Sequence, residues 1–320
     1  MSKKRLTQYV LLAVLLVLVP QFVRSDYALH LMIMVAIYGI LVLGLEIILG
    51  QTGLFSLGHA AFFGMGSYTS ALLVMRLGMP IWLGIVLAVL ASGILGFLLG
   101  FPTLRLRGDY LAIATLGFGE IFGLILVNWD SLTHGPMGIP GITRPEIFGV
   151  VFDKRMYLYL IVLLFILALA AAFRISNSFL GRTFRAIRDD EDAAEFLGIH
   201  ISKYKILAFI IGGMFAGLAG GFYAHYVTFI SPDSFTYEDS ETLLAMVFLG
   251  GAGTVIGPVV GAVVLVLLPE LLSFMVQWRM LVVGVIMVLV MIFRPQGLMG
   301  GGMKFLKIKK KEVARIGEKE

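Results

Sequence analysis

Two carboxylates inside apolar stretches are the first residues whose positions suggest chemistry. Glu120 lies in the middle of one such stretch, and Glu46 lies about one turn from the end of another. An ionisable group at membrane depth is costly, so each carboxylate is a functional hypothesis by default. Glu120 fits two roles, holding the ammonium group of a solute or serving as a hydrogen-bonded packing residue. We favour the packing role.

A polar, glycine-rich stretch over residues 50–59 is the second candidate site. Irregular backbone at membrane depth is tolerated only where it is buried in protein or lines a cavity. Residues 49–53 (LGQTG) are echoed by residues 249–253 (LGGAG), and paired glycine interruptions point to a translocation path, although a chance match is the alternative. We expect helix breaks at Gly53 and Gly253. The expected path-lining residues are Gly50, Gln51, Thr52, Gly53, Ser56, His59, Glu120, Gly250 and Gly253.

The sequence lacks the residues that several kinds of chemistry need. The chain has no cysteine, and its five histidines form no HExxH motif or other paired metal-ligand spacing. No phosphate-binding GxxxxGK[ST] loop occurs, and no His, Ser or paired Asp cluster has catalytic spacing. We therefore expect no metal, no cofactor and no enzymatic activity. If ATP drives this protein, a partner must hydrolyse it.

The elements that must position these residues are membrane helices. Hydrophobic residues make up 59% of the 320 residues, charged residues 14%, and the mean hydropathy is +0.96. A spanning helix needs about 20 mostly apolar residues. The sequence predicts an all-α polytopic bundle, one membrane domain over residues 1–320. The ten predicted crossings are 7–23, 28–50, 60–75, 81–101, 110–127, 157–173, 206–228, 241–250, 254–272 and 279–293.

The basic residues predict the orientation. Of the 25 Lys and Arg residues, 19 fall in segments on one side, which include the loop 174–205 and the tail 295–320. By the positive-inside rule this side is cytoplasmic, and both termini lie there. The segment 241–250 is too short to span alone and reads as half of a broken helix. Membrane topology and anionic lipid headgroups explain the net charge of +5, so no nucleic acid is expected as a partner.

The loop 174–205 carries the most informative pattern. Residues 181–199 read GRTFRAIRDDEDAAEFLGI, with a basic first half, an acidic second half and Gly198 as a plausible helix stop. The Glu-x-Ala-Ala-x-x-x-Gly pattern resembles the coupling loop of ABC importer permeases, which docks in a groove of the ATPase subunit. We expect one helix over 182–198, with Glu191, Ala194 and Gly198 on its docking face. The expected coupling residues are Arg182, Arg185, Glu191, Ala193, Ala194 and Gly198.

Four stretches together resemble the branched-chain amino acid permease family of ABC importers, the LivM-type subunit in particular. They are residues 49–64, 111–120, the coupling loop and 216–223. The resemblance implies an importer in a prokaryotic cell membrane. It also implies a LivH-like second permease, two cytoplasmic ATPase subunits and an extracytoplasmic substrate-binding protein as partners.

Two departures leave the solute open. The family often has an uncharged or amide residue where Glu46 stands, and often reads GGPNG where residues 134–138 read HGPMG. Branched-chain amino acids are the expected solutes, and urea, amides or sugars are the alternatives within ABC permeases. An ion-coupled transporter that uses Glu46 and Glu120 as ion sites is the rival outside that class.

Overall fold

The computed structural model describes residues 25–106, 108–147, 150–271 and short pieces between 284 and 299. The predicted crossing 7–23 lies outside the described residues, as do most of the crossing 279–293 and of the tail 295–320. The longer helices are α2 (Asp26–Leu45), α3 (His59–Leu77), α4 (Ile81–Gly100), α5 (Asp109–Asn128), α7 (Lys154–Asn177), α8 (Phe179–Asp189), α10 (Ile201–Val227), α11 (Tyr237–Gly250) and α12 (Ile256–Leu271). The shorter elements are η1 (Glu46–Gln51), η2 (Pro102–Arg105), α6 (Asp130–Thr133), η3 (Gly135–Met137), β1 (Ile139–Pro140), β2 (Glu146–Ile147), β3 (Val150–Val151), α9 (Glu191–Phe196), β4 (Phe229–Ile230) and η4 (Pro232–Ser234).

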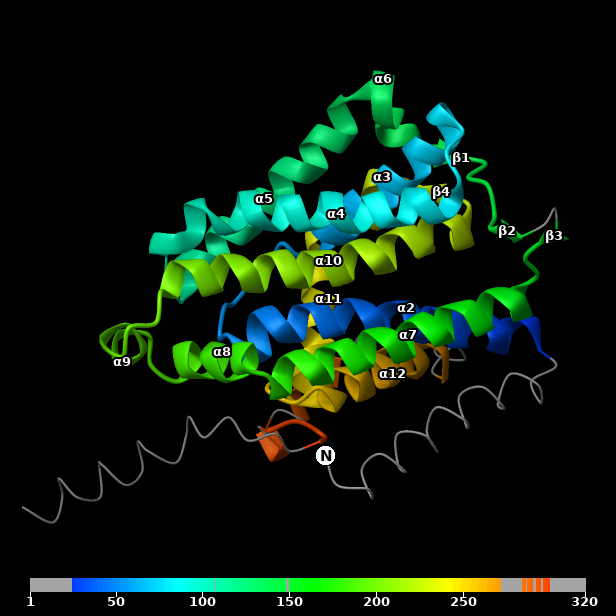
Figure 1. The fold of residues 1–320 in the computed structure, drawn as a ribbon. Coiled ribbons are helices and arrows are strands. Elements are labelled where there is room, and N and C mark those ends of the chain that lie inside the picture. Colours follow the sequence, from blue (N-terminus) through cyan, green and yellow to red (C-terminus); the bar gives the residue numbers. More distant parts are fainter. Residues whose placement is uncertain are drawn as a thin grey trace, which may run out of the picture.

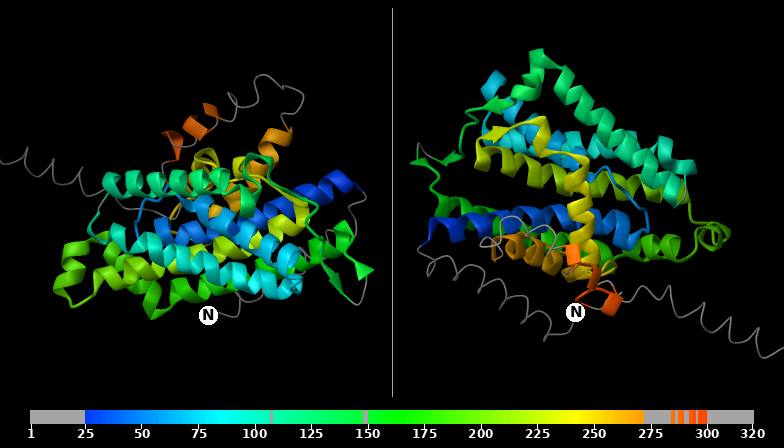
Figure 2. Two further views of the ribbon diagram at one scale, coloured as in Figure 1. Left: turned by 90° about the horizontal axis from the view of Figure 1, so that it is seen from above. Right: turned by 180° about the vertical axis from the view of Figure 1, so that it is seen from behind.

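The long helices form two groups that meet at α10 and α2 (Figure 1). On one side α10 packs against α3 and α4, and on the other α2 packs against α7 and α12. Helix α11 runs across the direction of these helices and ends against α12 (Figure 2). The bundle therefore has two distinct ends. Helices α8 and α9 lie at one end, which we call the α8–α9 end. The antiparallel pairs β1–β4 and β2–β3 lie at the other, which we call the strand end.

Small residues set the distance between helices. A Cβ built on Gly66 of α3 would lie 2.6 Å from the Gly217 Cα of α10, and one built on Gly96 of α4 would lie 2.4 Å from the Phe209 carbonyl oxygen. No side chain fits at such distances, so these crossings require glycine. Close backbone approach is how membrane helices gain contact where apolar lipid supplies no hydrophobic force. Glycine therefore sets the spacing between helices at these two crossings.

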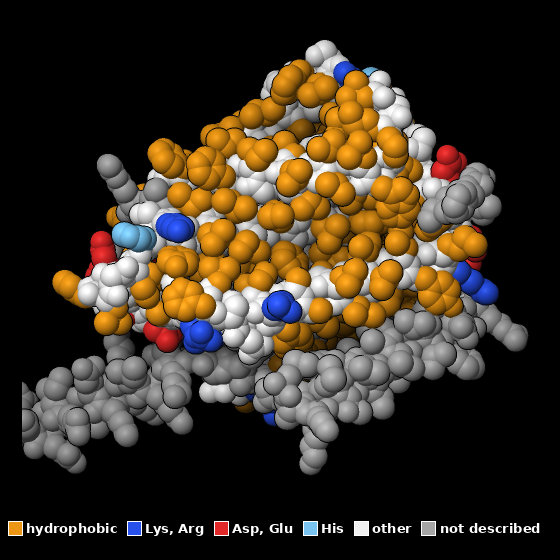
Figure 3. Space-filling view, viewed as in Figure 1, with side chains coloured by type: hydrophobic (Ala, Val, Ile, Leu, Met, Phe, Trp, Pro, Cys, Tyr) orange, Lys and Arg blue, Asp and Glu red, His pale blue; other side chains and the backbone are white. Residues whose placement is uncertain are grey.

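Much of the outer surface is apolar. Large hydrophobic side chains are exposed along α4, α5 and α7, among them Leu90, Ile94, Ile113 and Leu167. They cover most of one face of the molecule (Figure 3). An apolar surface of this extent suits lipid rather than water. The chain is a multi-pass membrane protein.

Five helices within the described residues are long and apolar enough to cross a bilayer: Asp26–Gln51, Ile81–Gly100, Asp109–Asn128, Lys154–Asn177 and Ile201–Val227. The predicted segments 241–250 and 254–272 correspond to the shorter helices α11 and α12. The all-α membrane bundle is confirmed, and the number of ten crossings stays a prediction.

Candidate functional site

Helix α8 is an amphipathic helix that packs one face on the bundle. The Ser178 hydroxyl caps its N-terminus by accepting a hydrogen bond from the Gly181 N–H at 3.4 Å. Phe184 and Ile187 are buried, whereas Arg182 is exposed and donates to the Asn177 carbonyl at 3.5 Å. This apolar stripe fixes which side of α8 faces the membrane helices.

The single helix predicted over 182–198 is wrong. The backbone leaves the helical region at Asp190, with φ −164° and ψ 111°, and a second helix, α9, begins at Glu191. The Asp190 carboxylate caps this new helix by accepting from the Ala193 N–H at 3.0 Å. At the other end Gly198 has φ +83°, and the Ile199 N–H bonds to the Ala194 carbonyl at 3.1 Å. The predicted stop at Gly198 is confirmed.

The break changes which residues α9 presents outward. Ala194, expected on the docking face, is 2% exposed. Glu191 also faces the bundle, since its carboxylate lies 2.7 Å from the nearly buried Lys205 ammonium of α10. The outward side holds Ala193, Phe196 and Leu197, of which Phe196 is 92% and Leu197 82% exposed. Sequence reasoning missed this apolar pair, although two large apolar residues directly before a helix-stopping glycine were a usable signal.

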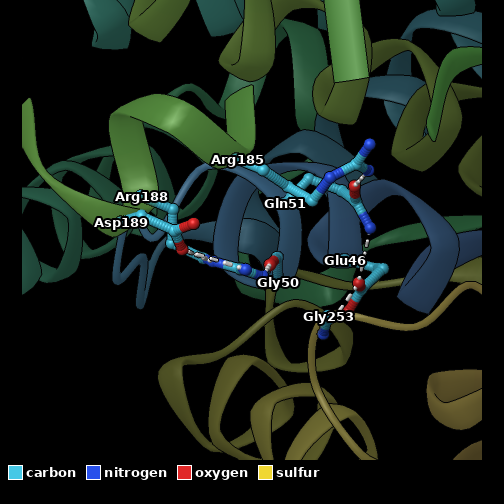
Figure 4. Close-up of polar contacts among 7 residues, drawn as sticks. All are labelled: Glu46, Gly50, Gln51, Arg185, Arg188, Asp189 and Gly253. Carbon is cyan, nitrogen blue, oxygen red and sulfur yellow. Dashed lines mark hydrogen bonds and ion pairs between the residues drawn. The ribbon is translucent and has the colours of Figure 1, made fainter. Parts of the chain in front are cut away.

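A polar cluster joins α8 to the end of α2 (Figure 4). The Arg185 guanidinium donates to the Gln51 side-chain oxygen at 3.0 Å and to the Ser176 carbonyl at 2.9 Å. The Ser176 hydroxyl donates to the same Gln51 oxygen at 3.2 Å. Arg185 and Gln51 were predicted for different sites, coupling and path lining. The structure brings them together.

A second arginine fastens the same junction. The Arg188 guanidinium donates to the Gly50 carbonyl at 2.7 Å and pairs with Asp189 at 3.2 Å (Figure 4). Gly53, at φ +75°, faces it so closely that a Cβ there would lie 2.7 Å from Arg188 Cγ. The α8 helix therefore lies directly on the glycine-rich stretch.

Both predicted helix breaks are confirmed. The π-helical turn η1 ends at Gln51, and residues 53–56 have no regular secondary structure before α3 begins at His59. Gly253, at φ +90°, lies in the turn between α11 and α12, where a Cβ on Gly250 would collide with the Gly257 carbonyl. The Glu46 carboxylate connects the two breaks, because its Oε1 accepts from the Gln51 amide at 3.1 Å and from the Gly253 N–H at 3.0 Å.

The other polar residues of the 50–59 stretch are buried in the single chain. The Thr52 hydroxyl donates to the Ile47 carbonyl at 2.8 Å, and His59 Nε2 lies 3.1 Å from the Leu41 carbonyl. Ser56 is fully buried, and its hydroxyl contacts no hydrogen-bonding group among the described residues. These contacts are internal, so the path-lining role stays a prediction.

Glu120 lies apart from this cluster, on the exposed side of α5. It borders a small pocket between α3, α5 and α11, with Leu57, Tyr237 and Ser240 among the lining residues. The burial expected for a packing residue is not found within this chain. Glu120 is instead an exposed residue at the border of this pocket.

A larger hollow of about 230 Å³ lies at the strand end, lined in part by His30, Arg144 and Tyr226. Its histidines already have partners: His30 Nδ1 lies 2.7 Å from the Tyr226 hydroxyl, and His225 lies 2.9 Å from Ser70 Oγ and 2.7 Å from the Thr143 carbonyl. We therefore place the candidate site at the α8–α9 end, where the predicted residues meet.

Comparison with known proteins identifies the family of the chain. Residues 27–291 match the family model described as the permease component of the branched-chain amino acid transport system. No solved structure matches the chain.

Two curated relatives are named for the same transport system. The chain is 41% identical to the high-affinity branched-chain amino acid transport system permease protein LivM of Salmonella typhimurium, covering 93% of this chain and 76% of the relative. It is 41% identical to LivM of Escherichia coli, covering 85% and 70%. The autoinducer 2 import system permease protein LsrC of Yersinia pseudotuberculosis is 28% identical, covering 66% and 62%. The chain therefore belongs to the family of branched-chain amino acid transport system permease components.

Proposed function

We propose that this chain is a permease subunit of an ABC importer for leucine, isoleucine and valine, driven by partner ATPases that bind at the α8–α9 end. A LivH-like second permease completes the membrane part, and an extracytoplasmic binding protein delivers the solute at the strand end. The α8–α9 end then lies in the cytoplasm of a prokaryotic cell, and the strand end faces outward. The basic loop 174–205 supports this orientation.

The solute assignment rests on relatives. The two relatives at 41% identity are named for branched-chain amino acids, whereas the permease named for autoinducer 2 is only 28% identical. The path residues named above, with the glycine breaks at their centre, remain the proposed lining. Glu120, which borders the small pocket between α3, α5 and α11, stays in this proposed set.

One observation carries the coupling proposal: Phe196 and Leu197 project from the tip of α9 with almost no contact to the rest of the chain. We interpret this apolar pair, which lies on a polar segment outside the apolar band of the membrane helices, as the docking contact. The break at Asp190 makes the projection possible by turning α9 away from α8. Arg182 and Arg185 on α8 remain among the proposed coupling residues.

The test is uptake by vesicles that contain this chain, the second permease, both ATPases and the binding protein. Labelled leucine should accumulate only with ATP, and urea or ribose should not. Phe196→Ser should lower ATP-driven uptake at least about tenfold, because burying a phenylalanine contributes about 1.5–3 kcal/mol to association. Leu77→Ser is the matched control, since Leu77 is 63% exposed at the strand end of α3.

Two results contradict the proposal. Leucine uptake driven by a sodium or proton gradient without ATPases identifies an ion-coupled transporter instead. Normal assembly and uptake with Phe196→Ser shows that the ATPases bind elsewhere.

A further inference from the structure

The helix breaks at Gly53 and Gly253, 200 residues apart in sequence, are connected through one oxygen atom. Oε1 of Glu46 accepts a hydrogen bond from Gln51, at the first break, and from the Gly253 N–H, at the second (Figure 4). Glu46 is 2% exposed, and its other oxygen has no partner among the described residues. All of the hydrogen bonds described for this carboxylate therefore run through Oε1.

The π-helical turn is what allows this contact. In an α-helix, side chains five residues apart point about 140° away from each other, so Glu46 and Gln51 would not meet. A π-helical turn bonds residue i to residue i+5 and brings such side chains onto one side. The Thr52 hydroxyl reaches the Ile47 carbonyl across the same spacing. The widened turn thus aims Gln51 at Glu46.

Gly50 is part of the same junction between the two helix breaks. A Cβ on Gly50 would lie 2.1 Å from Glu46 Oε2, so the carboxylate folds directly over this glycine. Any side chain at position 50 displaces the carboxylate. This offers a way to break the junction without changing Glu46 itself.

Gln51 also contacts α8: its side-chain oxygen accepts a hydrogen bond from the Arg185 guanidinium at 3.0 Å. An unbroken path of hydrogen bonds therefore runs from Arg185 through Gln51 and Glu46 to Gly253. Its far end lies in a turn with two glycines at positive φ, Gly251 at 113° and Gly253 at 90°, which connects α11 to α12. Helix α11 also lines the small pocket beside Glu120.

We propose that Glu46 is a positioning residue that transmits displacement of α8 to the Gly251–Gly253 turn and thereby to α11. This rests on the proposed function, in which α8 and α9 receive the motion of the ATPases. The acceptor oxygen of Glu46, rather than its charge, makes the connection. Glutamine at this position keeps that oxygen, and methionine removes it while nearly preserving the volume.

The first test uses the complete importer in vesicles and measures leucine imported per ATP hydrolysed. Glu46→Met should leave ATPase assembly intact but lower this ratio at least fivefold, and Glu46→Gln should restore it to within twofold. Gly50→Ala should imitate Glu46→Met. Ser67→Ala is the matched control, because Ser67 is equally buried and its hydroxyl bonds to the Gly220 carbonyl at 3.0 Å, away from this path.

A second measurement follows the motion itself. The chain has no cysteine, so Phe179→Cys on α8 and Ile256→Cys on α12, both exposed, allow two spin labels. A non-hydrolysable ATP analogue should shift the distance between them by about 2 Å. The shift should persist with Glu46→Gln and vanish with Glu46→Met. If Glu46→Met does not assemble, Gln51→Met removes the α8 side of the connection and should abolish the shift.

An unchanged import ratio and an unchanged distance shift in Glu46→Met overturn this inference. Equal impairment by Glu46→Gln and Glu46→Met overturns it as well, because the acceptor oxygen is then irrelevant. Failure of the proposed function looks different: Phe196→Ser then assembles and transports normally, whatever happens at Glu46.

Discussion

At the scale of single residues, the ion pair between Glu191 and Lys205 connects α9 to α10. The two charged groups are 2.7 Å apart, and their side chains are 19% and 4% exposed. The pair is therefore asymmetric: water reaches Glu191 but hardly reaches Lys205. Removing one partner of a buried pair costs most when the charge left behind stays buried.

This asymmetry predicts unequal effects of two substitutions. Glu191→Ala should destabilise the packing of α9 on α10 by about 3 kcal/mol, and Lys205→Met by about 1 kcal/mol, because the remaining Glu191 can be solvated. Hydrogen exchange of the Ala194 amide measures this local stability. Glu195→Ala, an exposed position on the same helix, should change the exchange rate less than twofold. A larger effect of Lys205→Met than of Glu191→Ala contradicts the account.

Residue roles were only partly predictable from sequence. Gly53, Gly198 and Gly253 were placed correctly at breaks, since glycine there marks backbone with positive φ. Ala194 was predicted on an outward docking face, but it packs against the bundle. A sequence shows that small and apolar residues share a face. It does not show whether the chain's own helices or a partner cover that face.

At the scale of elements, α10 organises the bundle through close contacts at glycines, several of which lie on its neighbours. It contacts α2, α3 and α4, and its crossings with α3 and α4 depend on backbone contacts at Gly66 and Gly96. Such contacts specify one register, because a side chain at the crossing forces the helices apart.

Gly96→Leu therefore should lower the stability of the folded chain by about 3 kcal/mol and its thermal midpoint in mild detergent by about 5–10 °C. Gly123→Leu is the matched control, because Gly123 is also helical and a Cβ there meets nothing within 4 Å. Equal midpoints for the two variants contradict the packing account.

The elements themselves were predicted with uneven success. Long apolar helices such as α2, α4 and α10 follow from composition and length alone. The split of 182–198 into two helices was missed, because the Asp190 cap and the break it stabilises are local features inside a continuous polar run. The π-helical turn at Glu46–Gln51 was missed too, and the hydrogen bonds from Gly253 and Arg185 to its side chains come from residues distant in sequence.

At the scale of the whole molecule, the two ends of the bundle are chemically different, with a lipid-facing apolar band between them (Figure 3). The α8–α9 end carries an exposed apolar tip, and a path of hydrogen bonds runs from α8 to the turn that follows α11. The strand end carries short strands and the hollow beside Arg144. In the proposed importer, energy enters at the first end and solute enters at the second.

The central claim, that ATPase subunits dock on the tip of α9, is tested most directly by site-specific crosslinking in transport-competent vesicles. The chain lacks cysteine, so Leu197→Cys supplies a single thiol at the tip and Met137→Cys supplies one at the strand end, where Met137 is 83% exposed. A short bifunctional reagent should join Leu197→Cys to an ATPase subunit and should leave Met137→Cys without such an adduct. A complex that imports leucine yet gives no ATPase adduct at position 197, or gives an equal adduct at position 137, contradicts this account.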